Sequence, residues 1–405
     1  MTRRPGTSAS GIDFNFPPPN PPVPPARCHI TRYPVNLTPT PSELCPHCAA
    51  PDRIKLWLPH LTSIAAHGPD IPQEARERVH TVTLHAWTAS TRTAYGTGLL
   101  VYHTFCSVHE IPEEDRAPAK ATLIARFISA LAGQYAGQTI QGYVYGLRAW
   151  HVLNSLPWSP NEAQVAAMLK GATKLAPPTS KQDLRQPVTP QIITDIRAHV
   201  SDSPLDTAFY ACLTTIFYAA ARVGEFTVHQ CDAFDPAENI TPANVRVDVD
   251  RNNLRTTVFT LPRTKSSASG EEVQWAKQDG PTEPQSALDA HMALNEPPLT
   301  GPLFAYKDGS KHKPLMKTTF LKLLKVKARA AGYNSVQGHG IRIGTTLEYL
   351  LRGIPFEVMK TKGRWASDAF QLYLRRHNQI LAHYIQAMST DIAIEFTRLT
   401  MPRAR

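Results

Sequence analysis

The longest apolar run in the chain is TAFYACLTTIFYAAA, residues 207 to 221, and it ends directly against Arg222. A bilayer-spanning helix needs about 20 apolar residues. This run of 15 residues instead predicts a helix buried in the core of a soluble domain. A buried helix that ends in arginine requires a partner for that charge. Glu225, one turn later in AARVGEF, can supply it, and a purely structural Arg222–Glu225 ion pair is one interpretation of the motif.

Apolar side chains recur at helical spacing between about Glu74 and Leu175, and the cap-like residues Ser90 and Thr91 precede the first stripe. The three stripes are Tyr95, Leu99, Tyr102 and Cys106, then Leu123, Phe127 and Leu131, then Ile140, Val144, Leu147 and His151. They predict a small all-helical bundle over residues 73–175. Taken alone, the bundle indicates no chemistry.

Proline-rich segments flank this bundle. Residues 1–72 contain FPPPNPPVPPA, which is polyproline-like and buries little, so we expect a largely disordered tail. APPTSKQDLRQPVTP, residues 176 to 190, has four prolines and no apolar periodicity, and it predicts a linker over residues 176–188. Thr189 is then expected to be an N-cap, with Pro190 at the first helical position of a second domain, residues 189–405.

Three segments with strand character interrupt the helical pattern of this second domain. They are NVRVDVD, RTTVFTL and EEVQWAK, separated by the turn sequences RNN and KSSASG. After Pro314 the pattern becomes helical again. We therefore expect a mostly helical domain with a small antiparallel sheet inserted in it.

Cysteine usage favours a reducing compartment, because six cysteines in 405 residues do not make a disulfide framework. Only Cys45 and Cys48 are close, in CPHC, which is half of a zinc-ribbon pattern that Cys28 and His60 could complete. Incidental cysteines in a proline-rich tail are the alternative. No nucleotide-binding loop and no other cluster with metal-ligand spacing is found in the sequence.

The positive charge of the chain is concentrated in one segment. Between Lys311 and Arg376 there are 14 basic and three acidic residues, a net charge of +11, whereas the whole chain carries +10. A solvated basic face would be the ordinary explanation of a charge run. Because the whole net positive charge of the chain lies in this one segment, a surface that binds a polyanion is the favoured interpretation.

Several residues after the apolar run are candidates for chemistry on a phosphate. Lys265, in LPRTKSSASGEE, lies at the tip of the predicted hairpin. His339 and Arg342, in GHGIRIG, are three residues apart on one face of a helix, and Trp365 follows in GRWAS. Each also has a structural explanation, since hairpin lysines are usually solvent-exposed and tryptophans usually pack in a core.

Tyr373 lies in GRWASDAFQLYLRRH, three residues after Phe370, and this spacing alone favours a core residue. The cations around it indicate instead a phenol placed where a phosphate binds; they are Arg364, Arg375 and Arg376. Tyr384, in HYIQAM, is a second candidate nucleophile. Tyr349 precedes the tryptophan and is expected to be a core residue.

The order of these residues resembles the tyrosine recombinase (phage integrase) family, and WASDAFQLYLR is most similar to the fungal Crypton-type eukaryotic members. The resemblance implies a mainly α fold with two parts. One is a helical core-binding (SAM-like) bundle that clamps DNA opposite the catalytic domain. The other is an α-rich catalytic domain with a small antiparallel sheet.

The resemblance also implies a phosphate pocket. Arg222 and Arg342 would bind the scissile phosphate, and Glu225 would support the first of these arginines. His339 and Trp365 would complete the pocket, with Trp365 standing where many members of the family have histidine.

The remaining roles follow from the same resemblance. Tyr373 would be the nucleophile that forms a 3′-phosphotyrosine, and Lys265 would be the general acid for the 5′-oxygen. The basic residues near the nucleophile would contact the DNA backbone; these are Arg364, Arg375 and Arg376.

The implied partner is double-stranded DNA, and cleavage and rejoining would need neither metal, ATP nor another cofactor. Residues 378–399 form an apolar-striped stretch that would either dock on a neighbouring protomer in a tetrameric synapse or pack on its own domain. The eukaryotic resemblance and the basic chain favour the nucleus, and no membrane association is expected. The alternatives are a type IB topoisomerase-like activity and a catalytically inactive, domesticated DNA-binding protein.

Overall fold

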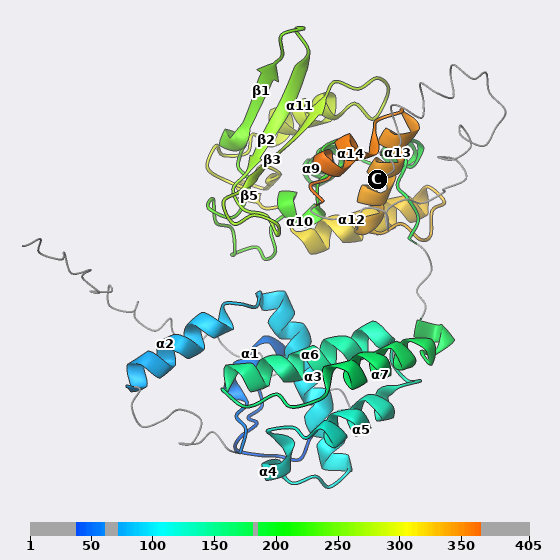
Figure 1. Cartoon of the computed structure of the whole chain (residues 1–405). Helices are drawn as coiled ribbons and strands as arrows, with labels where there is room; N and C mark the ends of the chain where they lie inside the picture. Colours follow the sequence, from blue (N-terminus) through cyan, green and yellow to red (C-terminus); the bar gives the residue numbers. More distant parts are fainter. Residues whose placement is uncertain (1–37, 61–71, 181–184, 366–405) are drawn as a thin grey trace, which may run out of the picture. The chain divides into compact units, whose positions relative to one another are not determined.

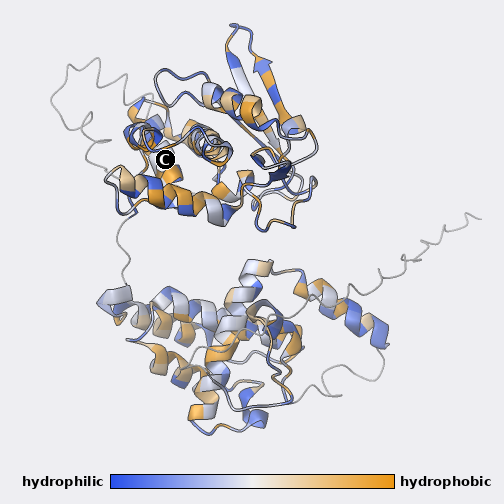
Figure 2. Ribbon diagram, turned by 180° about the vertical axis from the view of Figure 1, so that it is seen from behind, coloured by the Kyte–Doolittle hydropathy of each residue, from blue (hydrophilic) through white to orange (hydrophobic). Residues whose placement is uncertain are grey.

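The computed structural model describes residues 38–60, 72–180 and 185–365 (Figure 1). The chain divides into two compact units, Met1–Gln182 and Asp183–Arg405. Both units are mainly helical. Hydrophobic and hydrophilic residues alternate around many of the helices (Figure 2), which is the pattern of helices with one face in a core.

The first unit is entirely helical in its described parts. Its helices are α1 (Ala50–Leu56), α2 (Gln73–Leu84), α3 (Ala89–Val108), α4 (Glu113–Arg116), α5 (Ala121–Leu131), α6 (Gly137–Leu153), α7 (Glu162–Lys174) and the short 3₁₀ turn η1 (Pro178–Ser180).

The three predicted apolar stripes lie on α3, α5 and α6 and contribute to one hydrophobic cluster. This confirms the predicted helices. The N-cap of α3 is Thr88, whose hydroxyl accepts a hydrogen bond from the backbone N–H of Thr91, so the cap-like residues expected at 90 and 91 lie inside the helix.

Residues 38–60 correct the prediction of a tail that extends to residue 72. Helix α1 packs on α3, and Ile54 and Trp57 are completely buried in the cluster. The indole N–H of Trp57 donates to the carbonyl of Pro46, and that of Trp150 on α6 donates to the carbonyl of Trp57. Proline content marked the segment as a tail, but its apolar side chains fill a core that α3 and α6 leave open.

The second unit combines helices with a small sheet. Its helical elements are α8 (Pro190–Arg197), α9 (Pro204–Tyr218), α10 (Val223–Phe226), η2 (Pro242–Asn244), α11 (Pro284–Asn295), α12 (Lys317–Ala330), α13 (Gly338–Leu351) and α14 (Phe356–Lys362). Its strands are β1 (Val245–Val249), β2 (Arg255–Leu261), β3 (Glu271–Ala276), β4 (Tyr306–Asp308) and β5 (Lys311–Lys313).

The three predicted strands form an antiparallel sheet in the order β1-β2-β3, as expected. Phe259 of β2 lies at its centre, opposite Val245 of β1 and Val273 of β3. The two-stranded β4–β5 ribbon and helix α11 were not expected from the sequence.

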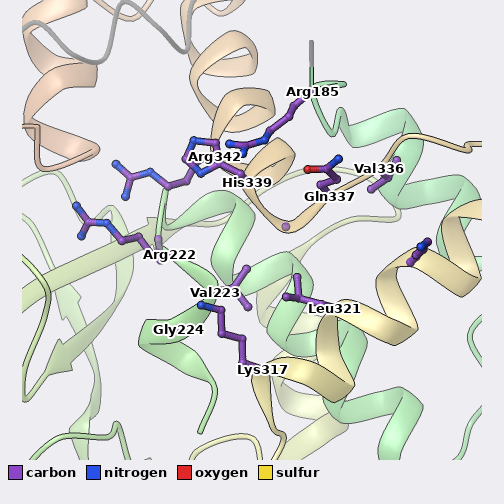
Figure 3. Close-up of a pocket in the computed structure, with 13 residues that line it drawn as sticks. Arg185, Arg222, Val223, Gly224, Lys317, Leu321, Val336, Gln337, His339 and Arg342 are labelled. Atoms are coloured by element: carbon purple, nitrogen blue, oxygen red, sulfur yellow. The ribbon is translucent and has the colours of Figure 1, made fainter. Parts of the chain in front are cut away.

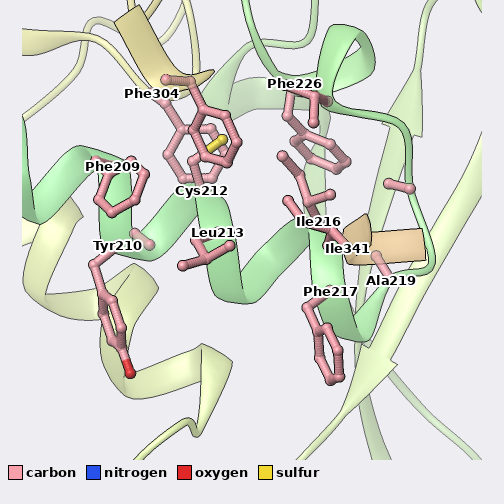
Figure 4. Packing of buried hydrophobic residues seen from close by; sticks show 14 of the residues in the cluster. Phe209, Tyr210, Cys212, Leu213, Ile216, Phe217, Ala219, Phe226, Phe304 and Ile341 are labelled. Atoms are coloured by element: carbon pink, nitrogen blue, oxygen red, sulfur yellow. The ribbon is translucent and has the colours of Figure 1, made fainter. Parts of the chain in front are cut away.

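The apolar run forms α9, which is the central helix of the second unit and contributes the most deeply buried side chains (Figure 4). The helix ends at Tyr218, earlier than the run does, because Ala220 adopts a left-handed backbone (φ +53°). The N–H of Ala221 donates to Ile216 O and that of Ala220 to Phe217 O, which together form a Schellman motif. Arg222 follows this turn and lies outside the core.

Thr189 caps α8 and Pro190 is its first residue, as predicted. The segment before it corrects the linker boundary at residue 188, because Val188 is completely buried and its N–H donates to the carbonyl of Gly340 on α13. Gly344 permits this contact, since a side chain there would overlap the carbonyl of Val188. Residues 185–188 therefore belong to the second unit.

Across the part of the chain that the structure describes, no helix combines the length and apolar character needed to cross a bilayer.

Candidate active site

A cavity of about 520 Å³ opens in the second unit between the start of α10, helix α12 and the N-terminus of α13 (Figure 3). It is called the cationic cavity here, because five of its 13 lining residues are arginine or lysine, one is histidine and none is acidic. Its basic lining residues are Arg185, Arg222, Lys317, Lys325 and Arg342, with His339 beside them. The N-terminus of α13 adds the positive end of a helix dipole.

Arg222 enters the cavity from the turn between α9 and α10. Its guanidinium donates to Glu225 Oε1 at 2.8 Å, and its backbone N–H donates to Glu225 Oε2 at 2.8 Å. The predicted pair therefore forms. It leaves about a third of the arginine side chain exposed, whereas the glutamate is 6% exposed. The carboxylate fixes the arginine, and the arginine still faces the cavity.

His339 and Arg342 lie on the first turns of α13, and both line the same cavity as Arg222. His339 is exposed and Arg342 is 4% exposed. The guanidinium of Arg342 donates to the carbonyl of Gly363 at 2.6 Å, and its Cζ lies 4.5 Å from the ring centroid of Trp365. A guanidinium over the face of an indole ring is attracted to it by a cation–π contact.

Trp365 borders Arg342 but does not line the cavity, so its role in completing the phosphate pocket stays a prediction. Its position depends on Gly363, because any side chain at residue 363 would overlap the indole ring. The close approach of the indole ring thus explains why residue 363 in the GRW sequence is glycine.

Arg364 corrects one prediction. Its side chain is 11% exposed and is bound by two carboxylates, Glu225 Oε2 and Glu271 Oε2, each at 2.6 Å. An arginine held in this way is not presented to a DNA backbone. It also has a left-handed backbone (φ +56°), which costs a non-glycine residue on the order of 1 kcal/mol, and the two ion pairs offset that cost.

Glu225 therefore joins two arginines, one from the cavity and one from the segment that carries Trp365. Glu271 of β3 is the fourth member of this cluster. Burial raises the pKa of the Glu271 carboxyl, but hydrogen bonds from Ser266, Arg364 and Thr264 outweigh burial, and the pKa is lowered from its ordinary value.

Lys265 lies on the turn between β2 and β3, as predicted, and is exposed. It does not line the cationic cavity. Its neighbour Ser266 accepts a hydrogen bond from Arg222 at 3.4 Å, so the turn that carries the lysine reaches the edge of the cavity.

Three lining cations were missed in the sequence: Arg185, Lys317 and Lys325. Arg185 was assigned to the linker, and the two lysines were counted only within the basic segment. The glycines at 338, 340 and 344 were the available indication, because small residues along one helix mark the close approach of another segment.

Tyr349 is buried and its hydroxyl donates to the carbonyl of Tyr218, which confirms it as a core residue. The other candidate residues of the C-terminal region lie outside the described residues. They are Tyr373, Tyr384, Arg375, Arg376 and the segment 378–399.

Cys45 and Cys48 are buried in the hydrophobic cluster of the first unit, and Cys45 Sγ lies 3.6 Å from His103 Nδ1. Burial is the main cause that raises the pKa of the Cys45 thiol to about 12. In residues 38–60, 72–180 and 185–365, no cluster of three or more histidine, cysteine or acidic side chains is arranged to hold a metal ion. Cys28 lies outside these ranges.

No protein-family model and no curated protein matches the chain. Among solved structures, the XerH site-specific recombinase bound to palindromic difH substrate, in a post-cleavage complex, matches with a TM-score of 0.50 at 12% identity. That match covers 84% of this chain and 96% of XerH. The XerA recombinase (TM-score 0.36, 16% identity, 78% and 99% covered) and an FLP recombinase–Holliday junction complex (0.33, 13%, 81% and 82%) are also similar. The chain has the α-rich fold of a tyrosine recombinase.

Proposed function

We propose that this protein is a site-specific DNA recombinase that cleaves and rejoins DNA through a 3′-phosphotyrosine intermediate. The observation that carries the proposal is the cationic cavity, in which Arg222, His339 and Arg342 meet although they come from separate parts of the chain. A site with several arginines and no acidic lining residue suits the phosphodiester group, because arginine binds it with bidentate, charge-assisted hydrogen bonds.

The chemistry proceeds by attack of the Tyr373 hydroxyl oxygen on phosphorus. The bond from phosphorus to the 5′-oxygen breaks, the phenolic proton passes to solvent water, and the 3′-phosphate remains on the tyrosine. Lys265 gives a proton to the departing 5′-oxygen, which becomes a 5′-hydroxyl. Arg222 and Arg342 stabilise the charge that develops on the phosphate oxygens.

Rejoining is the reverse reaction with a 5′-hydroxyl of another strand as the nucleophile. The phosphodiester bond energy is kept in the phosphotyrosine, so exchange requires no external energy source. The reference pKa of a tyrosine phenol is about 10, and the proposal requires cations of the site to favour the ionised form.

We extend the proposal to the related recombinases, the cellular location and the assembly on DNA. The sequence WASDAFQLYLR supports a relationship to Crypton-type recombinases and, with it, a nuclear location. Strand exchange requires two DNA duplexes, and we propose a tetramer on DNA in which residues 378–399 dock on a neighbouring protomer.

The test is covalent trapping on nicked duplexes taken from the DNA that flanks the gene. Wild-type protein should form an adduct that survives denaturing gel electrophoresis, and Tyr373→Phe should form none. An adduct that persists in Tyr373→Phe would transfer the role to another residue, with Tyr384→Phe as the next variant. Strand exchange between two labelled duplexes distinguishes a recombinase from a topoisomerase, which would only relax supercoils.

Arg342→Gln should lower the cleavage rate by about 100-fold or more, because one preorganised donor to the developing charge is lost. Its affinity for DNA should fall little, since affinity is spread over many phosphate contacts. Arg251→Gln, on the exposed turn after β1, is the matched control and should cleave normally. Equal losses of binding and cleavage in Arg342→Gln would contradict a catalytic role.

A further inference from the structure

The cationic cavity holds more positive charge than one phosphodiester can neutralise. Five lysine and arginine side chains line it, and the scissile phosphate carries a single negative charge. The predicted catalytic set accounts for only two of these cations, Arg222 and Arg342. The other three come from elements that supply no predicted catalytic residue.

Arg185 is the most informative of the three, because the residues that directly follow it dock against α13. Pro187 and Val188 are buried, and the N–H of Val188 donates to Gly340 O at 2.9 Å. Beside it, Gln186 accepts a hydrogen bond from the hydroxyl of Ser335 at 2.9 Å.

Two glycines of α13 leave room for the backbone of residues 186–188. A side chain at Gly340 would overlap the carbonyl oxygen of Gln186, and one at Gly344 would overlap that of Val188. The N-terminal part of α13, which carries His339 and Arg342, therefore also contacts the residues that follow Arg185. Figure 3 shows the Arg185 side chain extending toward Arg342 and His339.

We propose that Arg185 binds a second DNA phosphate, the neighbour of the scissile phosphate on the same strand, and we call its position the second phosphate subsite. The ligand is a strand with at least two consecutive charged phosphates. Successive phosphates of one strand are joined through a single nucleoside, and the lining cations are spread over one open cavity, so the cavity offers a cation for each of two neighbouring phosphates. The subsite rests on the proposed function for the identity of its ligand.

The experiment uses the full chain and two trinucleotide probes. One is TpTpT, and the other is TpTpT in which one phosphate is replaced by a neutral methylphosphonate, so that the nucleosides are identical and one charge is missing. Binding is measured by NMR titration at low salt. Wild type should bind the doubly charged probe about tenfold more tightly, as expected for one charge-assisted contact.

Arg185→Gln should lose most of this tenfold preference and keep its affinity for the singly charged probe. Lys322→Gln, at an exposed lysine of α12 that does not line the cavity, is the matched control and should keep the preference. Arg185 is exposed, and equal thermal unfolding of all variants will show that the fold is retained.

Equal affinity of the wild type for the two probes would overturn the subsite. Equal weakening of both probes by Arg185→Gln would also overturn it, because Arg185 would then share the first phosphate. Neither result depends on covalent trapping, which tests the proposed function separately. If the protein prefers the doubly charged probe but forms no covalent adduct, the second phosphate subsite is supported and the proposed recombinase function is contradicted.

Discussion

At the scale of single residues, Glu225 determines the geometry of the candidate site. The sequence pattern predicted its pair with Arg222, and the structure adds a second pair with Arg364. One carboxylate thus positions a cavity arginine and the backbone that presents Trp365. The second pair could not be predicted, because 139 residues separate its partners and Arg364 was explained equally well as a DNA contact.

Glu225→Gln should reduce the free energy of unfolding by about 3 kcal/mol, because it removes the carboxylate shared by the largely buried Arg364 and the partly exposed Arg222. Urea unfolding measures this loss. Glu272→Gln is the matched control, since Glu272 pairs with Arg246 on the exposed face of the sheet, where ion pairs contribute little. Similar losses in the two variants would contradict the central role of Glu225.

His151 provides a prediction about pH. Its Nε2 accepts a hydrogen bond from the N–H of Ala119 at 2.9 Å, and its Nδ1 donates to Leu147 O at 2.8 Å. Burial is the main cause that lowers the pKa of this histidine to about 4. The unfolded chain, with an ordinary pKa of about 6.5, therefore binds the proton more tightly than the folded protein does.

Stability contributed by His151 is complete above about pH 6.5 and is lost as the pH falls from there toward about 4. His151→Phe should be less stable at pH 7.5, because the Ala119 N–H loses its acceptor, but its stability should fall less between pH 6.5 and 5. Urea unfolding at several pH values measures the slope. His85→Gln, at an exposed position, should keep the wild-type slope, and an unchanged slope in His151→Phe would contradict the assignment.

At the scale of elements, periodicity was sufficient for α3, α5 and α6, whose apolar stripes meet one core. It was also sufficient for the β1–β3 sheet, in which β2 and β3 bury apolar residues in the other core, whereas Val247 and Val249 of β1 are exposed. It was insufficient for residues 38–60 and 185–188. Both segments are proline-containing and short, and their burial depends on surfaces formed by distant helices. The candidate site divides in the same way. Arg222 and Arg342 were predicted from the family resemblance, whereas the place of Arg185 depends on where a non-periodic segment docks.

Gly344→Ala tests that docking. The added methyl group would overlap the carbonyl of Val188, so segment 185–188 must shift, and we expect a loss of about 2 kcal/mol in unfolding free energy. Cleavage should fall as well, because Arg185 and the start of α13 move apart.

Gly171→Ala, on α7, is the control for the glycine substitution itself. No atom lies within 4 Å of the added methyl group, so this variant should be as stable as wild type or more stable by up to about 1 kcal/mol. Urea unfolding of the two variants gives the comparison. A Gly344→Ala protein that is as stable as Gly171→Ala would show that the segment does not dock as described.

At the scale of the whole molecule, the two largest of the three hydrophobic clusters in the described residues draw on separate stretches of the chain. One contains buried residues from Cys45 to Ala172, and the other contains buried residues from Val188 to Ile341. Each is large enough to support a domain, and large proteins commonly divide into domains that fold as units.

The separate clusters predict two unfolding transitions in calorimetry of the full chain. Phe127→Ala removes a completely buried ring from the first unit, and Phe217→Ala removes one from the second. Each substitution should cost about 3–5 kcal/mol and lower one transition by several degrees while the other stays in place. Val108→Ala and Val326→Ala, at exposed positions, should move neither transition. A single transition that both phenylalanine variants shift equally would mean that the two cores unfold as one cooperative unit.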